Sequence, residues 1–261
     1  MLWNNILKHL PEDLKLFNFL LLLQTEFQKL RRKPVIWLML LAAFVMPFFA
    51  AVYFRALGNL PVSPPLFYRW AAFGFTLFLL LPFILGLLCT ILVHDERQSR
   101  ILLQLWLVPI SKKSYFLGKF FIVLLYSLCF MLLTAIATFG FGISSGCISF
   151  QWNSFFFLLE KSMELAVLAA FAILPILAVS GLQKGYLFPV SLNLLYLFLG
   201  FFLTPVNPYL HPLSAASVLL AGNGEIPGFP VQEFSVFPAV LCICLWDTLA
   251  LLVAARSLKK G

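Results

Sequence analysis

The sequence predicts an all-α integral membrane protein with six transmembrane helices. Of its 261 residues, 62% are hydrophobic and only 11% are charged, and six long apolar runs divide the chain. The mean hydropathy is +0.99. A soluble domain usually carries about 25% charged residues, so this chain lacks the polar residues that a water-exposed surface requires. The composition therefore argues against a soluble enzyme, a nucleic-acid-binding protein and a disordered regulator.

Each apolar run is expected to form one transmembrane helix, because a helix needs about 20 apolar residues to cross a bilayer. The alternating polarity typical of outer-membrane strands does not occur in these runs. They are Val35–Phe54, Trp70–Val93, Phe120–Ile143, Leu165–Leu182, Tyr186–Leu203 and Ser235–Ala255. Only Gln183, Lys184 and Gly185 separate the fourth run from the fifth. So short a connection predicts an antiparallel hairpin of two helices.

The distribution of basic residues predicts the orientation. If the N-terminus is cytoplasmic, every Lys and Arg except Arg55, Arg69 and Lys161 falls on the cytoplasmic side of the six predicted spans. Cytoplasmic loops carry an excess of Lys and Arg, so both termini are expected in the cytoplasm. The net charge of +8 is then a topology signal and gives no reason to expect a nucleic-acid partner.

Residues 1–33 are expected to form a cytoplasmic segment containing an interfacial amphipathic helix, and residues 34–261 the six-span domain. Apolar side chains recur there at spacings of four and three, which places them on one helix face: Leu16, Leu20, Leu23, Phe27 and Leu30. Such a helix lies in the headgroup plane of the membrane. The alternative is a frayed tail that ends in a basic stop at Arg31-Arg32-Lys33. A signal peptide is disfavoured, because the acidic pair Glu12-Asp13 precedes the apolar core.

Motifs for catalysis and cofactor binding are not found. The only Gly-Lys pair, Gly118-Lys119, is followed by Phe120 and so does not form a phosphate-binding loop. His9, His94 and His211 lie in three separate segments, which gives no basis for a metal site. The longest external segment is Thr204–Phe234, within which Leu213–Ala221 is expected to form a short helix that dips into the outer interface.

The connection between the second and third predicted spans is the most informative segment. It opens with a charged run from His94 to Arg100, continues through an amphipathic stretch that reaches Val108, and is stopped by Pro109. This pattern predicts a short helix parallel to the membrane. A solvated loop is the simpler interpretation, and a docking element for a cytoplasmic partner is the more specific one.

The same segment resembles the signature of ABC-2 type permeases. In that family an acidic residue after the second span leads through paired leucines and a Pro-x-Ser to a Lys that opens the third span. The corresponding residues here are Glu96, Arg97, Leu102, Leu103, Pro109, Ser111 and Lys119. Glu26-Phe27-x-Lys29 is similar to the family's entry into its first span, while Ser99-Arg100 stands where the family often has Gly-Thr.

The resemblance implies the permease subunit of an ABC exporter in a bacterial cytoplasmic membrane. It would be driven by a separate ATPase subunit and paired, within membrane lipid, with a second permease copy or a sister permease. It would not itself be an enzyme or hold a cofactor. The ATPase-coupling residues would be Glu96, Arg97, Arg100, Leu102, Leu103, Pro109, Lys112 and Lys113. Size and the long external segment look most like the lantibiotic and bacitracin immunity permeases, which expel peptide antibiotics.

Ionisable residues inside predicted membrane helices are candidate functional residues, because a charge at the bilayer centre costs about 2.5–3.5 kcal/mol even on the mildest scale. Asp247 lies deep in the sixth run, and Glu160 and Glu164 lie one turn apart near the fourth. All three are candidates for the substrate path or the dimer seam. A hydrogen-bonded structural role is the alternative for Asp247, and a helix-end ion pair between Lys161 and Glu164 is the alternative for the glutamates.

Two other functions remain open from the sequence. Asp95-Glu96 with Arg100 resembles the acidic pair and arginine of the CAAX-type intramembrane proteases, but no histidine lies inside any of the predicted spans. A membrane assembly protein without transport activity is the other alternative.

Overall fold

The computed structural model describes residues 12–58, 61–98, 112–181, 185–222 and 235–257, and the regular structure in these ranges is helical. Five helical segments are long and apolar enough to cross a membrane: Pro34–Leu57, Pro64–His94, Ser114–Ser144, Trp152–Ser180 and Val236–Ala254. α11 (Leu187–Leu203) has 17 residues, fewer than the roughly 20 that usually span a bilayer. The all-helical membrane class is confirmed, whereas the count of six spans stays a prediction.

The first two segments are interrupted helices. The first comprises α3 (Pro34–Leu41), a 3₁₀ turn (η1, Ala42–Phe44) and α4 (Val45–Leu57). The second comprises α5 (Pro64–Tyr68), two π-helical turns (η2, Arg69–Phe73; η3, Thr76–Leu80) and α6 (Leu81–Gln98). A proline has no N–H to donate to the carbonyl four residues before it. Because this helical hydrogen bond is missing, the turn before the proline is distorted. Pro47 follows η1 in this way, and Pro82 follows η3.

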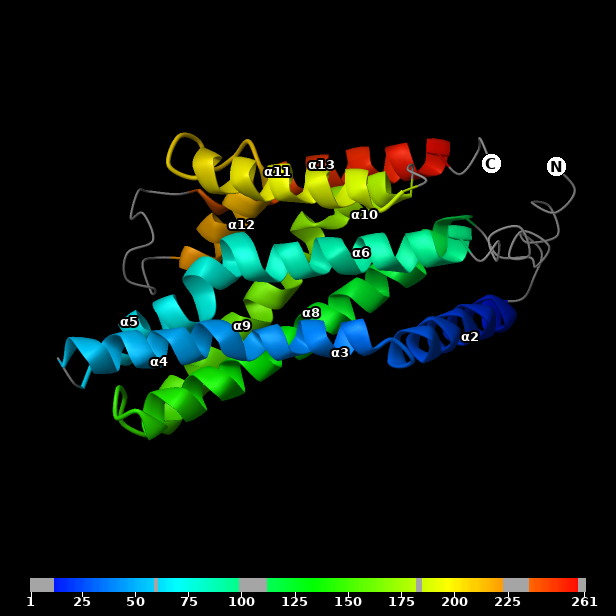
Figure 1. Cartoon of the computed structure of the whole chain (residues 1–261). Coiled ribbons are helices and arrows are strands. Elements are labelled where there is room, and N and C mark those ends of the chain that lie inside the picture. The colour runs from blue at the N-terminus through cyan, green and yellow to red at the C-terminus, as the bar shows by residue number, and fades with distance from the viewer. Residues whose placement is uncertain (1–11, 59–60, 99–111, 182–184, 223–234, 258–261) are drawn as a thin grey trace, which may run out of the picture.

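The remaining helices are α8 (Lys112–Ser144), α9 (Trp152–Ala172), α10 (Leu174–Ser180), α11, α12 (Pro212–Ala221) and α13 (Val236–Ser257). Figure 1 shows that the start of α2 (Glu12–Arg31), the end of α6, the start of α8 and the end of α13 lie at one end of the bundle. The sequence places all four of these helix ends on the cytoplasmic side. Which end of the bundle faces the cytoplasm stays a prediction.

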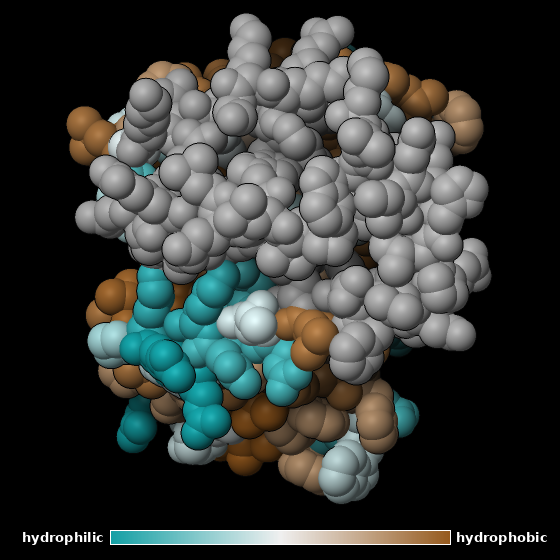
Figure 2. Space-filling model, turned by 90° about the vertical axis from the view of Figure 1, so that its right-hand side faces the viewer, coloured by the Kyte–Doolittle hydropathy of each residue, from teal (hydrophilic) through white to brown (hydrophobic). Residues whose placement is uncertain are grey.

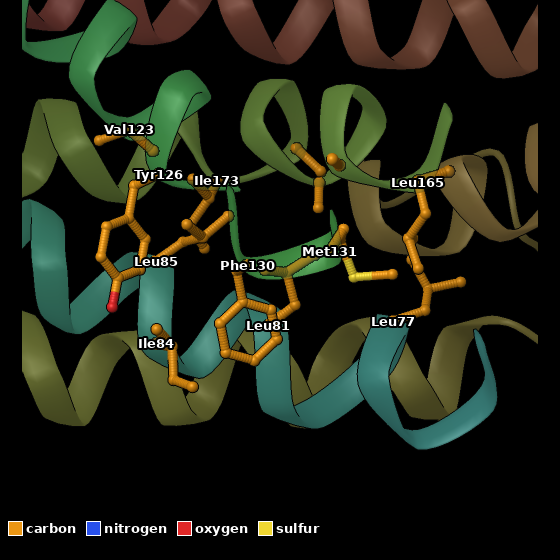
Figure 3. Packing of buried hydrophobic residues seen from close by; sticks show 14 of the residues in the cluster. Leu77, Leu81, Ile84, Leu85, Val123, Tyr126, Phe130, Met131, Leu165 and Ile173 are labelled. Atoms are coloured by element: carbon orange, nitrogen blue, oxygen red, sulfur yellow. The ribbon is translucent and has the colours of Figure 1, made fainter. Parts of the chain in front are cut away.

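The core lies where the second, third and fourth segments meet. Figure 3 shows side chains of η3 and α6 packed among those of α8 and α9, including Leu77, Leu81, Leu85, Phe130, Met131 and Leu165. In the second segment 67% of the most apolar window is buried, against 22% in the last segment. α13 is therefore a peripheral helix, and most of its surface is available to lipid or to a partner.

Several helices extend beyond the apolar runs that predicted them, and the differences are largest for α8 and α9. α8 begins at Lys112 and not at Phe120, and α9 begins at Trp152 and not at Leu165. In α9 the run is broken by Glu160, Lys161 and Glu164, but these residues are compatible with a helix, so the helix continues through them. The apolar runs thus located the membrane-embedded stretches and underestimated the helices.

The short helix in the long external segment is confirmed as α12, but its surroundings differ from the expectation. It packs against α9, α11 and α13, and nine of its residues are buried, among them Leu213, Ala216 and Leu220. A helix that is apolar or small on every face is stable only when it is enclosed. α12 is therefore part of the protein interior and does not lie at the surface.

The N-terminal helix is confirmed as α2, so the frayed-tail alternative is wrong for residues 12–31. α2 packs against α8. Leu20 and Phe27 of the predicted apolar stripe are exposed, whereas Leu30 is buried. Figure 2 looks onto this end of the bundle and shows hydrophilic residues gathered on its described part. The position of α2 in the headgroup plane stays a prediction.

Candidate functional site

A buried charge cluster joins three helices at the end of the bundle that the sequence assigns to the cytoplasm. Lys119 of α8 places its Nζ 3.1 Å from Oε2 of Glu26 in α2, and the same ammonium donates to the carbonyl of Leu92 in α6 at 2.9 Å. Both charged residues are only 2% exposed. Lys29 donates to the other carboxylate oxygen of Glu26 at 2.7 Å. We call Glu26, Leu92 and Lys119 the charged junction.

Further contacts hold the ammonium of the charged junction in place. Its nitrogen lies 4.8 Å from the ring centroid of Tyr115, one turn earlier in α8, a distance at which the ring attracts a cation. Because a buried ammonium is costly unless it is paired and hydrogen-bonded, Lys119 fixes the spacing of α2, α6 and α8.

The charged junction brackets the predicted ATPase-coupling segment. Glu96 and Arg97 lie in the last turn of α6, a few residues after Leu92, and Lys112 and Lys113 lie in the first turn of α8. Arg100, Leu102, Leu103 and Pro109 fall outside the described residues. Leu92 and Lys119 therefore lie only four to seven residues from the described ends of this segment.

Of the two glutamates in α9, Glu164 forms the ion pair that the sequence offered as the alternative to a substrate path or dimer seam. Lys161 pairs with Glu164 at 3.0 Å, three residues along the helix, and Glu160 is exposed. The ion pair is present, but it lies in the middle of α9 and not at a helix end. The role of the two glutamates in a substrate path or dimer seam stays a prediction. Both glutamates lie in α9, whereas the charged junction joins α2, α6 and α8.

A second polar cluster, which the sequence indicated only through Asp247, lies between α11, α12 and α13. The ring of His211, the residue before α12, lies 4.1 Å from the ring of Tyr196 and 6.1 Å from that of Trp246. Gly200 permits this approach, because a Cβ there would meet Nδ1 of His211 at 3.0 Å. We call Tyr196, His211 and Trp246 the His211 cluster, and Asp247 follows Trp246 in α13.

Most polar atoms of the His211 cluster have protein partners. Tyr196 donates to the carbonyl of Ala172, and Trp246 donates to the carbonyl of Leu210 at 3.2 Å. Nδ1 of His211 accepts the backbone N–H of Leu213 at 3.2 Å and so caps α12. Nε2 of His211 and Oδ1 of Asp247 are buried and have no hydrogen-bond partner among the described residues.

Burial lowers the pKa of His211 to about 4, so the ring is neutral at pH 7. In a neutral imidazole one nitrogen donates and the other accepts. Because Nδ1 accepts from Leu213, the proton of His211 lies on Nε2. Nε2 of His211 is therefore a donor that has no hydrogen-bond partner among the described residues.

Sequence reasoning missed His211 as a site residue, since an isolated histidine in a Pro- and Gly-rich segment carries no motif. The sequence does contain one indication. Pro212 marks the start of a helix, so His211 is expected at the helix N-cap, next to a helix without a polar face. Glu26 and Lys119 entered the sequence argument only as parts of a family resemblance, and their contact was not predicted.

Comparison with known families agrees with this architecture. A family model described as ABC-2 family transporter protein matches residues 22–200, which is more than half of the chain and includes all three residues of the charged junction. A search of curated proteins gives no match to the chain. The helical segments and the family together indicate a multi-pass membrane protein that is a transporter component. The chain belongs to the ABC-2 transporter family.

Proposed function

We propose that the chain is the permease subunit of an ABC exporter, driven by a separate cytoplasmic ATPase that binds the segment from Glu96 to Lys113. The family match carries this proposal. The charged junction supports it, because it ties both helices that flank the segment to α2. Movement of a docked ATPase would then be transmitted to three helices together.

The complete transporter would contain two permease units, either two copies of this chain or this chain and a sister permease. The peripheral position of the first segment and of α13 leaves two long apolar surfaces for lipid and for the second unit. The proposed cargo is a peptide antibiotic such as a lantibiotic, expelled from a bacterial cytoplasmic membrane. Glu160, Glu164 and Asp247 remain the proposed residues of the substrate path or the dimer seam.

Exchange of the two charges at the end of α6 tests the docking segment. The double variant Glu96→Arg, Arg97→Glu is expected to lose most of the ATPase subunit that co-purifies with the wild-type chain, because docking surfaces choose partners by charge complementarity. Arg55→Glu is the matched control, since Arg55 is exposed in the last turn of α4 and the sequence predicts it on the opposite side of the membrane. Undiminished recovery of the ATPase with the double variant would contradict the docking site.

Deletion of the chain from its host tests the cargo. The deletion strain is expected to become several-fold more sensitive to the exported peptide antibiotic in a panel of lantibiotics, bacitracin and unrelated inhibitors. Wild-type chain supplied from a plasmid should restore resistance. Unchanged sensitivity across all peptide antibiotics would reject antibiotic export while leaving the docking experiment unaffected.

A further inference from the structure

A groove with an apolar lining opens beside the first helical segment. It has a volume of about 680 Å³ and lies between that segment and α8, with Leu133 on the α8 side. Leu38 and Leu41 line it and are 67% and 61% exposed. Because the first segment is long and apolar enough to cross a membrane, the groove is filled in a bilayer by hydrocarbon chains or by another apolar protein surface. We call it the apolar groove.

One end of the apolar groove adjoins the turn between α2 and α3. Arg31, Arg32 and Lys33 occupy the end of α2 and the turn that follows it, and we call them the basic turn. The next residue, Pro34, lines the groove. Trp37, also in the lining, donates from its indole nitrogen to the carbonyl of Arg31 at 3.3 Å. Since tryptophan is enriched where hydrocarbon meets the lipid headgroups, the basic turn is expected at headgroup level.

Positive charge exceeds negative charge around the basic turn. Both of its arginines are exposed, and neither forms an ion pair with another described residue. The nearby carboxylate of Glu26 is already shared by Lys29 and Lys119. Burial and the repulsion of Lys119 and Lys29 lower the pKa of Lys33. A further anion at this turn would therefore be attracted by several cations that Glu26 does not neutralise.

We propose that the apolar groove and the basic turn together bind one anionic phospholipid, with an acyl chain in the groove and the phosphate at Arg31 and Arg32. Arginine is well suited to bind phosphate oxygens, and basic pockets between membrane helices bind anionic headgroups. A zwitterionic lipid has the same acyl chains but carries its own positive charge, so it gains less from the arginines. A second permease copy that filled the groove with apolar side chains would leave both arginines without an anion. The charge of the turn therefore favours the anionic lipid.

Fluorescence quenching at Trp37 tests the acyl chain and the headgroup together. The other five of the six tryptophans are replaced by phenylalanine, and the full chain is reconstituted into phosphatidylcholine bilayers. Phosphatidylglycerol or phosphatidylcholine with the same brominated acyl chains is then mixed in, because bromine quenches a tryptophan that it touches. A chain that keeps only Trp152 is the matched control. Trp152 is as exposed as Trp37, 62% against 57%, and does not line the groove.

Half-maximal quenching of Trp37 is expected at an about fivefold lower mole fraction of brominated phosphatidylglycerol than of brominated phosphatidylcholine. Trp152 should show no such preference. Arg31→Gln together with Arg32→Gln should remove the preference at Trp37, whereas Arg55→Gln, which removes an exposed arginine of α4, should keep it. Equal quenching of Trp37 by the two lipids would overturn the proposal. So would the absence of quenching by either lipid, since protein would then cover the groove.

Thermal unfolding of the chain with all its tryptophans decides if the single-tryptophan chains do not fold. In mild detergent, dioleoyl phosphatidylglycerol should raise the melting temperature, because a ligand that binds only the folded state stabilises it. Dioleoyl phosphatidylcholine and glycerol phosphate, which has no acyl chains, should leave it unchanged. Equal stabilisation by glycerol phosphate would assign the turn to free phosphate and overturn the lipid site. The site does not rest on the proposed function: an antibiotic panel without effect would leave both measurements as they stand.

Discussion

Lys119→Met is expected to lower the free energy of unfolding by about 3 kcal/mol. The substitution keeps the length of the side chain and removes its charge, so Oε2 of Glu26 loses its ammonium partner while it stays buried. Breaking a buried ion pair on one side usually costs about 3–5 kcal/mol. We expect the lower end of that range, because Lys29 still holds the other oxygen of Glu26.

Unfolding of the purified chain in mild detergent measures this effect, which corresponds to a fall of roughly 6–12 °C in the melting temperature for a domain of this size. Lys161→Met is the matched control. It breaks the ion pair with Glu164, whose side chain is 37% exposed, and solvent-exposed pairs contribute at most about 1 kcal/mol. Equal losses of unfolding free energy in Lys119→Met and Lys161→Met would contradict the larger contribution that we assign to the buried ion pair of the charged junction.

A double substitution separates the cost of an unpaired charge from the loss of packing. Glu26→Gln together with Lys119→Met leaves no unpaired carboxylate, so the double variant is expected to be more stable than Lys119→Met alone. Replacement of a buried ion pair by neutral groups is often close to neutral in stability. Transport driven by the ATPase subunit should nevertheless be lost in the double variant if the charged junction transmits movement between α2, α6 and α8.

The membrane-embedded helices could be predicted from the sequence because hydrocarbon imposes a simple rule. A spanning helix must form all its backbone hydrogen bonds within itself and expose apolar side chains to lipid. Both requirements can be recognised from the local amino-acid composition. Val35 and Ser235 of the predicted runs therefore lie within one residue of the segment starts at Pro34 and Val236. The rule does not apply to the parts of a helix that extend beyond the apolar layer. For this reason the starts of α8 and α9 were predicted too late in the chain.

The two polar clusters could not be predicted because each depends on distant segments meeting. Glu26 and Lys119 are 93 residues apart, and nothing in the local pattern around Glu26 distinguishes a buried glutamate from a solvated one. His211 likewise becomes a cluster member only because Gly200 lets α12 approach α11. The enclosure of α12 was predictable in principle, since its residues offer no polar face.

Gly86→Ala is expected to be the most damaging of the small substitutions, with a loss of about 1–3 kcal/mol in the free energy of unfolding, the usual cost of overpacking. A Cβ at Gly86 of α6 would lie 2.2–2.3 Å from three atoms of the Asn193 amide in α11. Asn193 is 1% exposed and donates from Nδ2 to the carbonyl of Phe83 at 3.3 Å. Its amide therefore has little room to turn away, and α11 must shift.

A second-site substitution distinguishes this clash from a general effect of alanine. Asn193→Ala removes the obstructing amide, so Gly86→Ala with Asn193→Ala should be more stable than the sum of the two single losses predicts. Gly140→Ala in α8 is the control, because a Cβ there meets no atom within 4 Å and alanine favours a helix over glycine by about 1 kcal/mol. Melting temperatures in detergent measure all four variants. Additive losses in the double variant would show that Gly86 and Asn193 are not in contact, and that α6 and α11 do not pack through this pair.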